Sequence, residues 1–129
     1  MKYATTELKE QLVQLDITSL LKTVDNDWTL IEEITNLFFT DAPKQLKRIQ
    51  LAITNNDTNE LLEAAHSLKG AAGAFGKNRV YDLAYELEQM GRSKNINAAE
   101  ECNTLLKEAL AVMENNLHAT LTENGVSSS

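Results

Sequence analysis

Apolar residues recur every three or four positions along most of the chain, a spacing that places them on one face of an α-helix. One such stretch starts at Trp28 and runs to about Phe39, and another runs from Thr58 to about Gly76. No stretch shows the alternation of apolar and polar residues that is typical of a half-buried strand. The pattern therefore predicts an all-α protein.

Residues that favour caps and turns divide the chain into six predicted helices. Asp16 is a possible cap for a short first helix, and Asn55-Asn56-Asp57 marks a later break, because these side chains bond to nearby backbone amides. Gly76 and Gly91 are interpreted as helix ends, since glycine adopts the backbone conformation of a helix C-cap easily. The predicted helices span about 16–24, 28–39, 41–54, 58–76, 80–91 and 97–120.

Pro43 leaves the boundary between the second and third of these helices open. Proline lacks a backbone N–H but is tolerated in a first helical turn, so Thr40 or Asp41 can cap a new helix at this point. A kink in one long helix is the alternative. The sequence alone does not decide between the two.

Amphipathic helices with short connections pack most simply side by side. We therefore predict an antiparallel four-helix bundle with an additional short N-terminal helix. A chain of 129 residues can bury one continuous core. Residues 1–122 are assigned to this single domain, and residues 123–129 to a flexible C-terminal tail.

Composition and charge narrow the classes of function. The formal net charge of -7 argues against nucleic acid as a partner, because neutralising phosphates requires clustered Lys and Arg. Cys102 is the only cysteine, so neither an intramolecular disulfide nor a multi-cysteine zinc site is possible. No apolar stretch is long enough to span a membrane, and the N-terminus does not resemble a signal peptide. We expect a cytoplasmic protein without membrane association.

The candidate chemistry lies in residues 64–76 of the fourth predicted helix. His66, Lys69, Gly70 and Gly73 stand at positions i, i+3, i+4 and i+7, so they share one helix face. An apolar stripe runs beside that face and would turn toward the core. His66 is therefore predicted to be exposed on the flank of the bundle.

Two glycines beside a histidine are unusual in a helix interior, where each costs about 1 kcal/mol relative to alanine. We infer that Gly70 and Gly73 leave a bare patch around His66 on which another protein can dock. A neutral imidazole is a good nucleophile near pH 7, because its unperturbed pKa is about 6.5. The ammonium group of Lys69, one turn away, is placed to stabilise a phosphoryl group on His66.

This run resembles the histidine phosphotransfer (HPt) family, whose motif is a histidine followed by x-x-Lys-Gly and by a second glycine ten positions after the histidine. Here these residues are His66, Lys69, Gly70 and Gly76. The resemblance extends upstream over Phe39-Thr40-Asp41-Ala42-Pro43. It extends downstream over Leu83 to Gly91, which is similar to the family's Leu-Glu-x-x-Gly ending.

The resemblance implies a relay protein of a two-component phosphorelay, in which His66 carries a phosphoryl group between receiver-domain aspartates. The expected partners are the receiver domains of a hybrid histidine kinase and of a response regulator, and the chain itself is expected to be a monomer and not an enzyme. It needs no cofactor of its own, since Mg²⁺ comes with the receiver. The residues expected to contact the partner are Ser67, Gly70, Gly73 and Gly76.

Two alternatives stand beside this interpretation. The phosphoacceptor domain of a chemotaxis-type kinase resembles the same family closely, although the chain contains no ATP-binding glycine boxes. A metal-binding bundle is the alternative from another class, because Glu63 and His66 match the Glu-x-x-His spacing of di-iron proteins. Such sites require a second pair, and the only other histidine, His118, follows Glu114 at i+4.

The helix after the histidine helix often supplies a polar side chain near the histidine in this family. Glu88 and Gln89 are the candidates for that position. A carboxylate there would repel a phosphoryl group, so the sequence leaves the assignment open.

Overall fold

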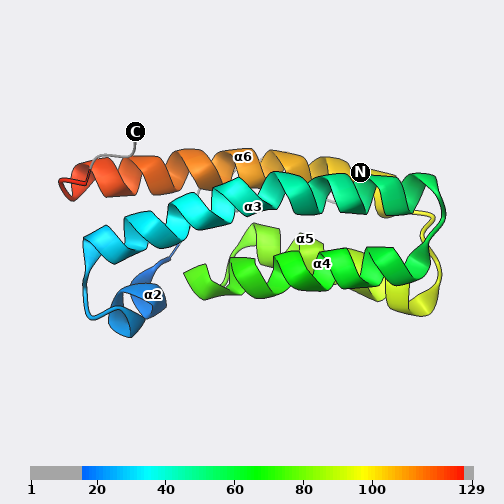
Figure 1. The fold of residues 1–129 in the computed structure, drawn as a ribbon, viewed down its shortest axis with the longest axis horizontal. Helices are drawn as coiled ribbons and strands as arrows, with labels where there is room; N and C mark the ends of the chain where they lie inside the picture. The colour runs from blue at the N-terminus through cyan, green and yellow to red at the C-terminus, as the bar shows by residue number, and fades with distance from the viewer. Residues whose placement is uncertain (1–15, 127–129) are drawn as a thin grey trace.

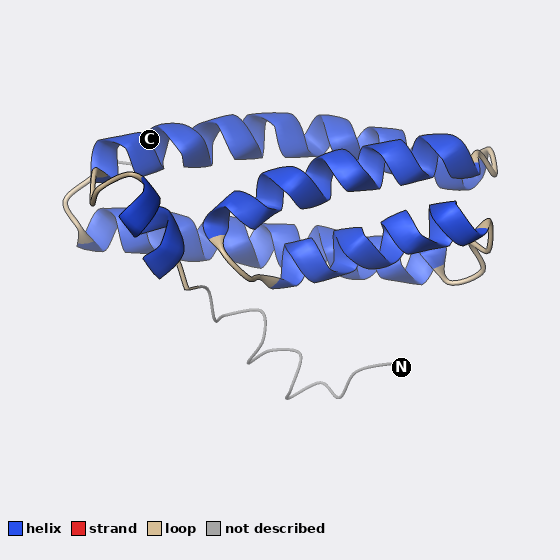
Figure 2. Cartoon of the chain, turned by 90° about the horizontal axis from the view of Figure 1, so that it is seen from below, coloured by secondary structure: helices blue, strands red, loops and turns tan. Residues whose placement is uncertain are grey.

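The computed structural model describes residues 16–126 of the chain. These residues contain no strand, which confirms the prediction of an all-α fold (Figure 2). Each helix runs antiparallel to the next among the four that form the body of the bundle, and the short helix α2 lies at one end beside α3 and η1 (Figure 1). The elements are α2 (Thr18–Thr23), α3 (Trp28–Thr54), α4 (Thr58–Ala72), the 3₁₀ turn η1 (Gly73–Phe75), α5 (Arg79–Ser93) and α6 (Ala99–Glu123).

The helix α3 continues through Pro43, so of the two alternatives that the sequence left open, one long helix is the one that forms. Its N-cap is Asp27, whose side chain accepts a hydrogen bond of 3.2 Å from the Leu30 amide. An interior proline costs about 3 kcal/mol or more. Buried residues on both sides of Pro43, from Ile31 to Ile53, offset this cost by packing on the same core.

The prediction that α5 ends at Gly91 is wrong, because the helix continues to Ser93 and Lys94 caps it with a left-handed backbone. Gly91 is buried where α5 meets α4. A Cβ at position 91 would lie 2.7 Å from the Leu62 amide nitrogen and 2.8 Å from the Thr58 carbonyl oxygen. The glycine therefore permits the close approach of the two helices instead of stopping one of them.

The core of the bundle is made mainly of aliphatic side chains from every helix, together with Phe38 and Phe75, whose rings meet edge-on. Helix α6 ends at Glu123, one residue beyond the predicted domain boundary, and Val126 still packs against the core. The last residues of the predicted tail, 127–129, lie outside the described residues. Within 16–126, no helix is both long enough and apolar enough to cross a membrane.

Candidate functional site

Helix α4 presents His66 to solvent because its apolar stripe faces the core. Asp57 caps the helix by accepting a hydrogen bond of 3.1 Å from the Glu60 amide. The buried residues of the stripe are Leu61, Ala64, Ala65, Leu68 and Ala72. The His66 side chain, on another face, is 67% exposed, as the sequence predicts.

Asn78 fixes the turn that brings α5 alongside α4. Its side-chain amide donates hydrogen bonds of 2.8 Å to the Ala72 carbonyl and 2.9 Å to the Gly76 carbonyl, and its oxygen accepts from the Tyr81 amide at 2.8 Å. Gly76 has φ of 89°, and a Cβ there would lie 2.8 Å from the Asp16 carbonyl oxygen. The backbone conformation of this turn therefore explains why position 76 is a glycine, and no contact with a partner protein is needed to explain it.

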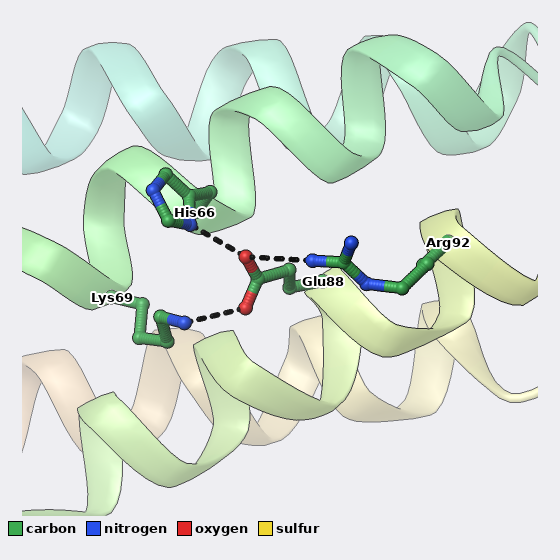
Figure 3. Close-up of polar contacts among 4 residues, drawn as sticks. All are labelled: His66, Lys69, Glu88 and Arg92. Carbon is green, nitrogen blue, oxygen red and sulfur yellow. Dashed lines mark hydrogen bonds and ion pairs between the residues drawn. The ribbon is translucent and has the colours of Figure 1, made fainter.

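The register set by this turn places Glu88 directly against His66. Its Oε2 lies 2.5 Å from His66 Nδ1, and its Oε1 accepts a hydrogen bond of 2.7 Å from Lys69 Nζ. Arg92, one turn further along α5, donates from Nη2 to the same Oε2 at 3.4 Å. These four residues form one cluster around a carboxylate whose side chain is only 2% exposed (Figure 3).

The cluster keeps the Glu88 carboxylate ionised. Burial by itself raises the pKa of this group, but the hydrogen bonds from Lys69 and His66 outweigh burial, and the pKa lies below its ordinary value. The same hydrogen bond has the opposite effect on its donor and raises the pKa of Lys69. Both groups are therefore charged over the whole neutral pH range.

An ionised carboxylate at Nδ1 selects one tautomer of the His66 imidazole. A carboxylate can only accept a hydrogen bond, so the neutral ring carries its proton on Nδ1 and a lone pair on Nε2. Figure 3 shows Nε2 directed away from Glu88. The arrangement makes Nε2 the nucleophilic atom and separates it from the carboxylate.

Glu88, and not Gln89, is thus the polar side chain beside the histidine. The objection that a carboxylate repels a phosphoryl group applies weakly to this geometry. Glu88 contacts the opposite nitrogen of the ring, and Lys69 and Arg92 counter its charge.

The four predicted partner contacts divide into two groups. Ser67 and Gly70 are exposed beside the imidazole, and a Cβ at position 70 would meet nothing within 4 Å. Gly73 lies against α5, where a Cβ would be 3.4 Å from the Tyr81 ring. Gly73 is exposed as well and this distance is an ordinary contact, so of the four residues only Gly76 is required by the fold itself.

Sequence reasoning missed an exposed apolar side chain on α3. Leu37 is 71% exposed, the highest value among the large apolar side chains that the structure describes. It precedes Arg48 by three helical turns and so shares its face. Arg48 pairs with Glu60 of α4 at 2.9 Å, which places this face of α3 beside α4. Leu37 is followed directly by Phe38 and Phe39, so its sequence context resembles that of a core position and gives no signal of exposure.

A metal-binding bundle would require a second set of ligands, and the described part of the chain does not supply one. Residues 16–126 hold no group of three or more His, Cys, Asp or Glu side chains suited to a metal ion. His66 contacts Glu88 of the neighbouring helix and makes no such contact with Glu63.

A comparison with protein families gives a match over most of the chain. The family model described as the Hpt domain matches residues 33–116, a segment that starts in α3, contains all of α4 and α5, and ends in α6. No curated protein and no solved structure matches the chain.

Proposed function

Because the chain belongs to the Hpt domain family, whose members act in histidine phosphotransfer, we propose that His66 is the phosphoacceptor of a phosphorelay and that it reacts through Nε2. The observation that carries this proposal is the contact between His66 Nδ1 and the buried Glu88 carboxylate. It leaves Nε2 as the exposed atom with a free lone pair.

The transfer step follows from this tautomer. The Nε2 lone pair attacks the phosphorus of a receiver aspartyl phosphate, and the bond between phosphorus and the aspartate oxygen breaks. The aspartate leaves as a carboxylate with the bonding electron pair. The proton on Nδ1 stays in place, so the ring becomes a phosphorylated imidazolium whose positive charge faces Glu88.

Glu88 lowers the barrier to this step in both directions. Its attraction for Nδ1–H grows as the ring gains charge, which lowers the barrier to phosphorylation. Because the ring stays protonated on Nδ1, it is also a good leaving group when a second receiver aspartate attacks the phosphorus. The same contact therefore suits a relay that both accepts and donates.

In this proposal, Lys69 stabilises the phosphoryl group on His66. Its side chain is 18% exposed and lies one turn from His66, with Nζ bound to Glu88 in the unphosphorylated chain. A flexible ammonium group can turn toward phosphoryl oxygens without a fixed geometry.

The receiver docks on the exposed surface formed by Leu37, Ser67 and Gly70. Gly70 allows a close backbone approach, and Leu37 supplies apolar area at the edge. The receiver brings the acidic site and its Mg²⁺, which offsets phosphoryl charge during transfer.

Incubation with a phosphorylated receiver domain and Mg²⁺ tests the proposal. Intact-mass measurement should show the gain of one phosphoryl group, which is lost in acid. His66→Gln should abolish the gain and His118→Gln, the matched control in α6, should retain it. Phosphorylation that survives in His66→Gln would contradict the assignment.

A further inference from the structure

Arg92 takes no part in the transfer step, yet it contacts the buried carboxylate at the centre of the cluster. Its side chain is 58% exposed and donates to Glu88 Oε2 at 3.4 Å. Resting on the proposed phosphotransfer function, we propose that Arg92 is a positioning residue that acts through Glu88 and supplies the charge that balances a phosphoryl group on His66.

The net charge of the cluster supports this role of Arg92. With a neutral imidazole, the single negative charge of Glu88 faces the permanent positive charges of Lys69 and Arg92, which leaves one positive charge in excess. Phosphorylation adds about two negative charges, and the protonated ring contributes one positive charge. The phosphorylated cluster is then neutral, and without Arg92 it would hold an uncompensated negative charge.

The geometry also separates the tasks of the two cations. Lys69 binds Oε1, whereas Arg92 binds Oε2, the oxygen that His66 Nδ1 uses. Figure 3 shows Arg92 on the side of Glu88 away from Lys69. If Lys69 turns toward the phosphoryl oxygens, Arg92 remains as a cationic partner of the buried carboxylate.

The other charged or titratable groups near the cluster do not replace Arg92. Tyr85 lies under Lys69, with Nζ 5.4 Å from the ring centroid, and carries no positive charge. Glu86 of α5 points toward α6, where its carboxylate is 3.8 Å from Cys102 Sγ. On α3, Arg48 is engaged with Glu60.

The test compares Arg92→Gln, which removes the charge, with Arg92→Lys, which keeps it. Lys107→Gln, an exposed lysine of α6, is the control for net charge alone. Each protein is phosphorylated with phosphoramidate, a small donor that needs no receiver. The lifetime of the phosphohistidine is followed by intact mass, and the melting temperature is measured with and without phosphorylation.

Arg92→Gln should shorten the phosphohistidine lifetime by about three- to tenfold, the effect of one charge several ångströms away in a partly solvated site. It should lower the melting temperature more in the phosphorylated form than in the unphosphorylated form. Arg92→Lys and Lys107→Gln should behave like the wild type.

Three results would overturn the role of Arg92: a wild-type lifetime in Arg92→Gln, an equal loss in Lys107→Gln, or equal melting shifts in both forms of Arg92→Gln. The last would show a structural contact only. All three leave the phosphotransfer function standing. A wild-type protein that accepts no phosphoryl group from either phosphoramidate or a receiver would instead refute that function and this inference together.

Discussion

Replacing Glu88 with glutamine removes the charge from the centre of the cluster and changes little of the side-chain volume. The carboxylate accepts hydrogen bonds from His66 and Lys69 while it is almost completely buried. The glutamine amide can donate to Nδ1, which favours the opposite tautomer, with the proton on Nε2 and no lone pair there. The variant should therefore retain the fold and lose nucleophilicity.

The contact between Glu88 and His66 sets the size of the effect. A hydrogen bond to a charged group contributes about 1.5–3 kcal/mol, and the contact gains this strength as the ring becomes an imidazolium. By transition-state arithmetic, its loss slows phosphorylation by about one to two orders of magnitude. Loss of the bond to Lys69 should also destabilise the fold by about 1–2 kcal/mol.

The assay is a time course of phosphoryl transfer from a labelled receiver to Glu88→Gln, with Glu63→Gln as the matched control. Glu63 is an exposed glutamate of α4, one turn before His66, so its substitution removes a nearby charge without touching the imidazole. Circular dichroism checks that both variants are folded. Transfer at the wild-type rate by a folded Glu88→Gln would refute the argument that Glu88 prepares Nε2.

Three further predictions follow from the same geometry. Lys69→Ala should shorten the phosphohistidine lifetime measured by intact mass, and an unchanged lifetime would remove Lys69 from the mechanism. Gly70→Gln should block receiver binding in calorimetry without lowering the melting temperature, because the position is open and glutamine is the better helix former; normal binding would move the dock elsewhere. Gly91→Ala should destabilise the fold by about 1–3 kcal/mol in urea denaturation, since the added Cβ meets the backbone of α4; wild-type stability would mean that the helices separate at little cost.

A fourth further prediction concerns the effect of pH on the stability of the fold. The pKa of Glu88 is lower in the folded chain than its ordinary value of 4.5, so this group stabilises the fold above that pH and the contribution is lost as the pH falls through the folded value. The stability difference between the wild type and Glu88→Gln should therefore shrink in acid. A difference that stays constant from neutral pH down to strong acid would show that the Glu88 charge does not stabilise the fold.

Local signals were sufficient to place most of the helices and the histidine. Asp57 was expected at a break and does cap α4, and the apolar stripe of α4 placed His66 on the exposed flank. Pro43 left a helix boundary open and Gly91 was wrongly interpreted as a helix end, for one shared reason. Their local preferences favour helix ends, but each sits in a helix that packs over its whole length, and packing outweighs propensity.

Sequence periodicity could not identify the side chain that contacts His66. Whether Glu88 or Gln89 meets the imidazole depends on the rotation of α5 about its axis, which Asn78 sets by bonding the end of α4 to the start of α5. One signal was available. Tyr81, Tyr85, Glu88 and Arg92 follow one another at helical spacing beside the apolar stripe of α5, as a second face turned toward α4.

Under the proposed function of His66, a buried carboxylate beside it suits a carrier that must also release the phosphoryl group. A cluster with permanent cations alone would hold the phosphoryl group tightly and hinder its transfer to the next receiver. Glu88 cancels one of those charges and keeps the proton on Nδ1, so the phosphorylated ring remains a good leaving group. Under the proposed function, the balance between Glu88 and its two cations then determines how readily the phosphoryl group is passed on.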